Sequence, residues 1–202
     1  MDAVRVALLR EVLAGTEWLN ATRRFAGALR GSVVTHGGGL LLLGTPDYEP
    51  WHLAAHLVDE AAWSGTPELA PTLVRHDARP TDPAHLAVGP GRIETARRGE
   101  TLLVVAPGDS DALLERIHTA RRAGVTVLTL SATTTATDDA LTAMAHETLT
   151  VPEAAELDLD TVQHLVSAAT GENGPSPRGR RRFRDRLARL AETVMAPPPT
   201  PW

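Results

Sequence analysis

The chain has 202 residues, 43% of them hydrophobic, and a formal net charge of −5, which suits one globular domain with a substantial core. It contains no cysteine and no lysine, which excludes disulfides, thiolate chemistry and lysine Schiff bases. No apolar run approaches the roughly 20 residues that cross a bilayer, and the start of the chain, with Asp2, Glu11 and no uninterrupted apolar core, is unlike a signal peptide. We therefore expect a cytoplasmic protein.

The first part of the chain is predicted to be helical over residues 2–30, with a break at Gly15 and Thr16. Strands and helices then alternate, starting with the continuous apolar strand Leu40–Leu43. Alternation at this spacing predicts a parallel five-stranded sheet with right-handed crossovers, an α/β fold built as a three-layer α/β/α sandwich. The predicted strands are 40–43, 71–75, 101–105, 125–130 and 147–151, and the predicted helices are 51–63, 93–98, 111–123, 138–145 and 160–170.

The C-terminal part differs from the body, which we take as one domain over residues 1–171. Residues 172–180 form a predicted linker, 181–195 a basic amphipathic helix, and 196–202 a Pro-rich tail. Residues 172–202 hold seven arginines and three acidic residues, so the rest of the chain is strongly acidic and is not expected to bind nucleic acid. The basic helix can dock on that acidic body or a second subunit, or bind an anionic membrane or nucleic acid. Its apolar residues are Phe183, Leu187, Leu190 and Val194.

A histidine pair stands out in the helix that follows the first strand. His52 and His56 are four residues apart, so both imidazoles lie on one helix face. The helix begins just beyond a strand, where open α/β sheets bind ligands, and the pair has the spacing of two zinc ligands. The alternative is that both histidines are solvated on the polar face, opposite an apolar side. That apolar side consists of Leu53, Leu57, Val58 and Ala61.

Four strings, in their order and spacing over about residues 5–171, resemble the sugar isomerase (SIS) domain, particularly its phosphoheptose isomerase branch. They are GGGLLLLGTPDYEPWHLAAHL, RRGETLLVVAPGDSDALLERIHTARRAGVTVLTLSA, HETLTVPE and DLDTVQHLVSAAT. The resemblance implies a five-stranded parallel sheet, a homodimer or homotetramer with active sites where subunits meet, and a sugar-phosphate substrate.

The resemblance also implies which side chains act. Phosphoheptose isomerases carry a His and, four residues later, a Glu on the first helix; His52 matches the His, and His56 stands where the Glu is expected. Gln163 matches a Gln of the last helix, the family's later His position is Gly171, and His164 can substitute for it. The implied catalytic residues are His52, His56 and Gln163, and a zinc ion would use these three with His164.

The loops that bind phosphate in the family differ here. The first reads GTPDYE and the second APGDSD, and their carboxylates would repel a phosphate, so a neutral or cationic ligand or a metal fits better. A neighbouring subunit can restore phosphate binding by supplying positive charge from its Arg75, Arg92 and Arg97. Asp109 or Ser110 has an alternative role as a helix cap, and so does the Thr-rich loop after Ser131. The candidate ligand-binding residues are Gly44, Thr45, Asp47, Asp109, Ser110 and Ser131.

Three functions are open at this point. The first is an SIS-domain protein that binds a sugar or sugar-phosphate-like metabolite and isomerises it with the histidine pair. The second is a non-catalytic domain that senses such a ligand, and the third is an oligomeric partner of another enzyme. The altered loops favour the second, whereas the histidine pair favours the first.

Overall fold

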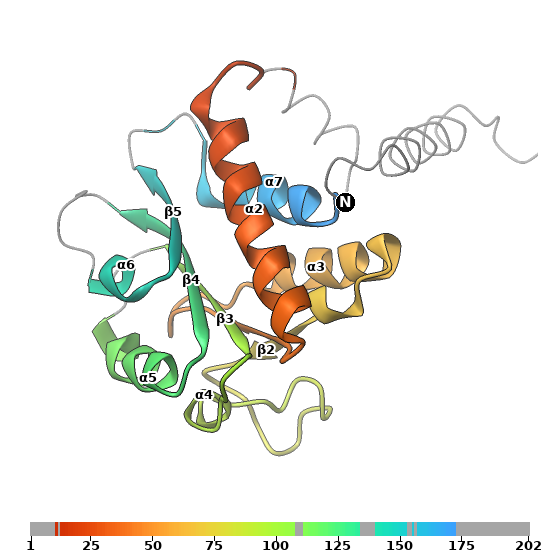
Figure 1. The fold of residues 1–202 in the computed structure, drawn as a ribbon. Helices are drawn as coiled ribbons and strands as arrows, with labels where there is room; N and C mark the ends of the chain where they lie inside the picture. The colour runs from red at the N-terminus through yellow and green to blue at the C-terminus, as the bar shows by residue number, and fades with distance from the viewer. Residues whose placement is uncertain are drawn as a thin grey trace, which may run out of the picture.

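The core of the protein is a five-stranded, entirely parallel sheet with strand order β2-β1-β3-β4-β5 (Figure 1). The computed structural model describes residues 11, 13–107, 111–133, 140–152, 155 and 157–172. The strands are β1 (Leu40–Leu43), β2 (Pro71–Val74), β3 (Thr101–Ala106), β4 (Thr126–Thr133) and β5 (Glu147–Pro152).

Helices cover both faces of the sheet (Figure 1). On one face lie α2 (Glu17–His36), α3 (Trp51–Ser64) and α7 (Leu159–Thr170), and the other face carries α4 (Gly91–Glu94), α5 (Asp111–Arg122) and α6 (Ala140–Met144). A short 3₁₀ turn, Pro67–Leu69, precedes β2. The prediction of a three-layer α/β/α sandwich with a five-stranded parallel sheet is therefore confirmed.

Strand β1 shows why the sequence folds in this way. Side chains alternate across a sheet, and here Leu40 and Leu42 pack into the core beneath α2, α3 and α7, while Leu41 and Leu43 pack into the core beneath α4, α5 and α6. All four are at most 2% exposed, because helices cover both faces of the sheet and β1 is a central strand with β2 on one side and β3 on the other. A run of four leucines is thus the expected sequence for a central strand that is covered on both faces.

Most predicted elements match the structure within three residues, but two do not. Helix α2 continues to His36, six residues beyond its predicted end, because Val33 is fully buried in the core and holds the last turns on the sheet. The helix predicted at 93–98 is wrong: the structure has only the short α4, which ends at Glu94. Beyond it, the Arg97 carbonyl and amide both contact Glu100 in the turn that leads into β3.

Several predicted segments fall wholly or largely outside the described residues. They are most of the first N-terminal helix, the loop that follows β3, nearly all of the Thr-rich loop after β4, and the C-terminal linker, basic helix and tail. In the part of the chain that the structure describes, no helix combines the length and apolar character needed to span a membrane.

Candidate functional site

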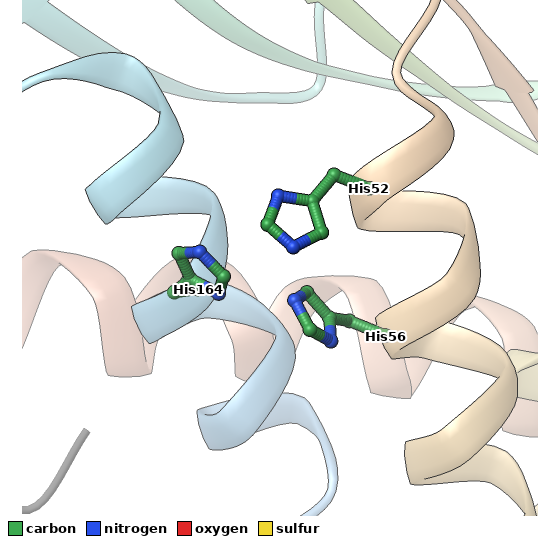
Figure 2. Close-up of side chains that lie close together, drawn as sticks. All are labelled: His52, His56 and His164. Carbon is green, nitrogen blue, oxygen red and sulfur yellow. The ribbon is translucent and has the colours of Figure 1, made fainter. Parts of the chain in front are cut away.

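Three histidines converge between α3 and α7 (Figure 2). His52 and His56 project from successive turns of α3, and His164 reaches them from α7. The ring centroids are 4.5 to 4.7 Å apart, and one ring nitrogen of each residue lies within 4.8 Å of the others. The spacing of four along α3 places the first two rings on one face, and the packing of α7 against α3 adds the third. We call these residues the histidine cluster.

His56 is the most constrained member of the cluster. Its side chain is 5% exposed, and neither Nδ1 nor Nε2 has a hydrogen-bond partner among the residues that the structure describes. The pKa of His56 is lowered from 6.5 to about 4, mainly by burial and also by the nearby His164 and His52, while Asp59 acts in the opposite direction. His56 is therefore a neutral imidazole at physiological pH, which is the form that binds metals.

This burial corrects the expected division of α3 into two sides. The alternative in which both histidines are solvated is wrong for His56, which is 5% exposed; Glu60, one turn later, is 4% exposed, whereas Val58, expected on the apolar side, is 49% exposed. The reason is that α7 packs along the face of α3 that bears His56 and Glu60, so a polar helix face is covered by a second helix.

Gln163 lies next to His164 in α7 and is 3% exposed. Its Nε2 donates hydrogen bonds to the Tyr48 hydroxyl at 2.9 Å and to Asp160 Oδ1 at 3.0 Å, and the Tyr48 hydroxyl in turn donates to Asp160 Oδ1 at 3.1 Å. Burial raises the pKa of Tyr48, and the negative charge of Asp160 adds to this, so the hydroxyl keeps its proton. The Gln163 amide is thus held by Tyr48 and Asp160 at the start of α7.

Sequence reasoning missed Tyr48 and Asp160. Asp160 stands three residues before Gln163 in a predicted helix, which is enough to place the two side chains on one face. Nothing in the sequence indicated that Tyr48, 112 residues before Asp160, joins them. This contact ties the loop after β1 to α7.

The loop between β1 and α3 folds back on itself. The Tyr48 amide donates to the Thr45 carbonyl at 3.0 Å, and a Cβ at Gly44 would lie 1.8 Å from the Tyr48 carbonyl oxygen, so only glycine fits there. Thr45 is 4% exposed, whereas Asp47 is at the surface. Of the ligand-binding residues predicted in this loop, Asp47 therefore projects to solvent, while Gly44 and Thr45 shape the turn.

Glu49, at the end of this loop, is neutralised within the chain. Its carboxylate accepts hydrogen bonds from Arg75 Nε at 3.1 Å, from the His76 amide at 3.1 Å and from Trp51 Nε1 at 3.0 Å. Arg75 also pairs with Asp82 at 2.8 Å. Arg75 is therefore already paired with carboxylates, and Arg92 is paired with Glu100. Neither arginine can neutralise a bound phosphate unless its ion pair opens.

The other predicted ligand residues lie apart from the histidine cluster or outside the described chain. Ser131, near the carboxyl end of β4, is 2% exposed, and its hydroxyl lies 3.3 Å from that of Thr150 on β5. Asp109 and Ser110 fall outside the described residues.

Gly171, the family's later His position, packs against α3. A Cβ placed there would lie 1.8 Å from Glu60 Oε2 and 2.7 Å from the Glu60 carboxyl carbon. The space that a side chain at this position would fill is occupied by the Glu60 carboxylate. The third histidine of the cluster therefore comes from His164, nearly two helical turns earlier.

The order of the strands places this site where ligands bind in related architectures. Strand β2 lies on one side of β1 and β3 on the other, so the direction in which the chain adds strands reverses at β1. Open α/β sheets bind ligands beyond the carboxyl ends of the strands at such a reversal. The loop 44–50 leaves β1 at that end, and α3 follows it directly.

No protein-family model and no curated protein matches the chain by sequence. Among solved structures, the chain resembles a "putative sugar binding protein" from Salmonella typhimurium LT2, with a TM-score of 0.52 and 14% identity over 95% of this chain and 52% of that one. It thus spans about half of the Salmonella protein.

A second match is the sugar isomerase domain of an RpiR transcription factor from Sphaerobacter thermophilus, with a TM-score of 0.52 and 13% identity over 94% of this chain and 97% of that one. A phosphoheptose isomerase from Francisella tularensis matches with a TM-score of 0.48 and 14% identity over 85% and 98% of the two chains. The Salmonella and Sphaerobacter similarities show that this chain has the fold of the sugar isomerase domain.

Proposed function

We propose that this chain binds zinc through His52, His56 and His164 and uses the site to bind, and to isomerise, a sugar or sugar-phosphate-like metabolite. The observation that carries this proposal is the convergence of three imidazoles with ligand atoms within 4.8 Å of one another, one of them buried with both nitrogens unpartnered.

The energetics of His56 support a metal. A buried polar group without a hydrogen bond costs on the order of 1–3 kcal/mol, and a bound cation would give one His56 nitrogen a partner. Imidazole is a preferred zinc ligand, and the chain has no thiolate that would favour a softer metal. Three histidine ligands leave a fourth position open in a tetrahedral site, as in catalytic zinc centres.

An isomerase needs two things from such a site. Zinc, when bound, would polarise the substrate carbonyl and stabilise the enediolate. A base must also move a proton between adjacent carbons, and since the lone pairs of the three imidazoles would hold zinc, this base must be another group near His52, the exposed cluster member that a ligand can reach. Gln163, held by Tyr48 and Asp160, assists from α7. Substrates without a strong negative charge suit the loop best, because Asp47 projects from it to solvent.

A non-catalytic role in ligand sensing is the second candidate. It is favoured by the loop after β1, in which Gly44 and Thr45 form a closed turn and Glu49 is neutralised by Arg75. Assembly as a homodimer or homotetramer stays a prediction in either case.

Zinc titration of the purified, chelator-stripped chain tests the proposal. We expect one zinc per chain by calorimetry and elemental analysis, and at least a tenfold loss of affinity in His56→Gln and His164→Gln. The matched control is His118→Gln, since His118 is an exposed histidine on α5, on the other side of the sheet. Equal affinity in all four proteins, or no zinc binding in any, would contradict the metal site.

Turnover separates the two candidate functions. The zinc-loaded protein should interconvert the ketose and aldose forms of a neutral sugar faster than those of a sugar phosphate, and His52→Ala should abolish the conversion. Binding detected by a thermal shift, with no conversion in the wild-type protein, would favour ligand sensing instead.

A further inference from the structure

Helix α3 carries an apolar stripe on its solvent side. Trp51, Ala55, Val58 and Ala62 are spaced by four, three and four residues, so they form one line along the helix, and all four are exposed. Trp51 is 41% and Val58 49% exposed, although the Arg75 guanidinium lies 4.8 Å from the centre of the Trp51 ring. We call these four residues the α3 stripe.

The stripe is unusual within the described part of the chain. The large hydrophobic side chains that are exposed there are Val34, Trp51, Val58 and Trp63, and three of these four belong to α3. Exposed helix faces are normally polar, and a continuous apolar face marks a surface that packs against something.

The described chain ends next to this helix. Gly171, directly after α7, is in contact with Glu60 in the third turn of α3, and the description stops one residue later, at Glu172. Residues 173–202 therefore start beside the carboxyl-terminal half of α3. A linker of eight residues, 173–180, can span up to about 27 Å, which exceeds the length of α3, about 21 Å.

The sequence that follows matches the stripe in spacing and in charge. Phe183, Leu187, Leu190 and Val194 are also spaced by four, three and four residues. Residues 173–202 contain seven arginines and two acidic residues, whereas residues 1–172 contain 13 arginines and 23 acidic residues. Asp59, half-buried beside the α3 stripe, adds an acidic partner at the surface in question.

We propose that residues 181–195 form a helix that packs its apolar side on the α3 stripe of the same chain. The segment starts at the carboxyl-terminal half of α3, so the antiparallel orientation is the one that needs the least linker, and we propose that orientation. The spacings then place Leu187 opposite Val58 and Leu190 opposite Ala55. The two apolar lines are each about 16 Å long, so they cover one another end to end.

The docked helix would border the histidine cluster. His52 is the neighbour of Trp51, is exposed, and lies on the side of the α3 stripe that faces α7. Arginines beside it would give the site the positive charge that the loop after β1 lacks. This consequence rests on the proposed function, whereas the docking itself does not, so the experiment below uses metal-free protein.

Disulfide trapping in the full-length chain tests the docking, because the protein has no native cysteine. Val58→Cys combined with Leu187→Cys should form an intramolecular disulfide under mild oxidation, since the two Cβ atoms must come within about 4.5 Å. The control pairs Val34→Cys with Leu187→Cys: Val34 is 50% exposed on α2, is not part of the α3 stripe, and should not cross-link.

Hydrogen exchange provides a second measurement that needs no cross-link. Amides of residues 181–195 should exchange at least tenfold more slowly in the wild-type chain than in Val58→Asp, and Val34→Asp should behave like the wild type. Equal exchange in all three proteins, equal cross-linking of both cysteine pairs, or a covalent dimer of Val58→Cys alone would overturn the proposal. The last result would assign the α3 stripe to a second copy of the chain.

Discussion

His56 departs furthest from what its residue type normally does in a folded protein. A buried imidazole usually has a hydrogen-bond partner on at least one nitrogen, yet both His56 nitrogens lack one. Two other imidazoles lie within 4.7 Å of its ring, so protonating His56 would create a positive charge beside two groups that can also become positive. The local chemistry therefore favours a neutral His56, the state that a cation can bind.

This burial predicts a specific pH dependence for the metal-free protein. The pKa of His56 is lowered from 6.5 to about 4, so the unfolded chain takes up this proton at a higher pH than the folded chain does. The contribution of His56 to stability is thus complete above about pH 6.5 and is lost progressively as the pH falls toward 4.

Urea unfolding between pH 4 and 7.5 measures this effect, with His56→Gln as the comparison, because the difference between the two proteins cancels the titration of all other groups. The wild type should lose more stability than the variant between pH 6.5 and 4. Parallel curves for the two proteins would show that His56 titrates normally.

At the scale of elements, the contact between α3 and α7 determines the geometry of the site. Each helix presents polar side chains to the other, with His56 and Glu60 on α3 and His164 on α7. The helices can approach closely at their ends because residue 171 has no side chain, so the Glu60 carboxylate fills that space.

Gly171→Ala should therefore destabilise the protein by about 1–3 kcal/mol, the usual cost of overpacking, since the new Cβ would lie 1.8 Å from Glu60 Oε2. Chemical denaturation measures the change. Gly27→Ala is the matched control: Gly27 lies inside α2, a Cβ there meets nothing within 4 Å, and the substitution should stabilise by about 0.5–1 kcal/mol. A neutral Gly171→Ala would mean that Glu60 moves aside freely.

The elements themselves could be predicted from the sequence, whereas much of the site could not. The leucines of β1 and the spacing of His52 and His56 depend on local periodicity, which a sequence displays directly. The burial of His56 under α7 and the hydrogen bond between Gln163 and Tyr48 join segments that are about 100 residues apart in the chain. A local sequence pattern does not display such contacts. The helix predicted at 93–98 is wrong because the contacts of Glu100 in the turn before β3 outweigh the local helix propensity of these residues.

At the scale of the whole molecule, the histidine cluster joins distant parts of the chain. His52 and His56 follow the central strand β1, whereas His164 lies in α7, after the last strand β5. The cluster therefore exists only when the entire sheet has formed and both helices are packed on the same face. A ligand that needs all three imidazoles binds the folded state and not the unfolded chain.

Zinc should accordingly stabilise the whole protein and not only the site. At a free zinc concentration 100 times the dissociation constant, the free energy of unfolding should rise by about 2.7 kcal/mol. For a chain of this size that corresponds to an increase in Tm of roughly 5–10 °C, measurable by calorimetry and reversed by a chelator. His164→Gln should abolish most of this increase, because it leaves only the two ligands of α3, which a locally helical segment can present without the rest of the fold. His118→Gln should keep the increase in full, and a shift that survives in His164→Gln would mean that zinc binds elsewhere on the protein.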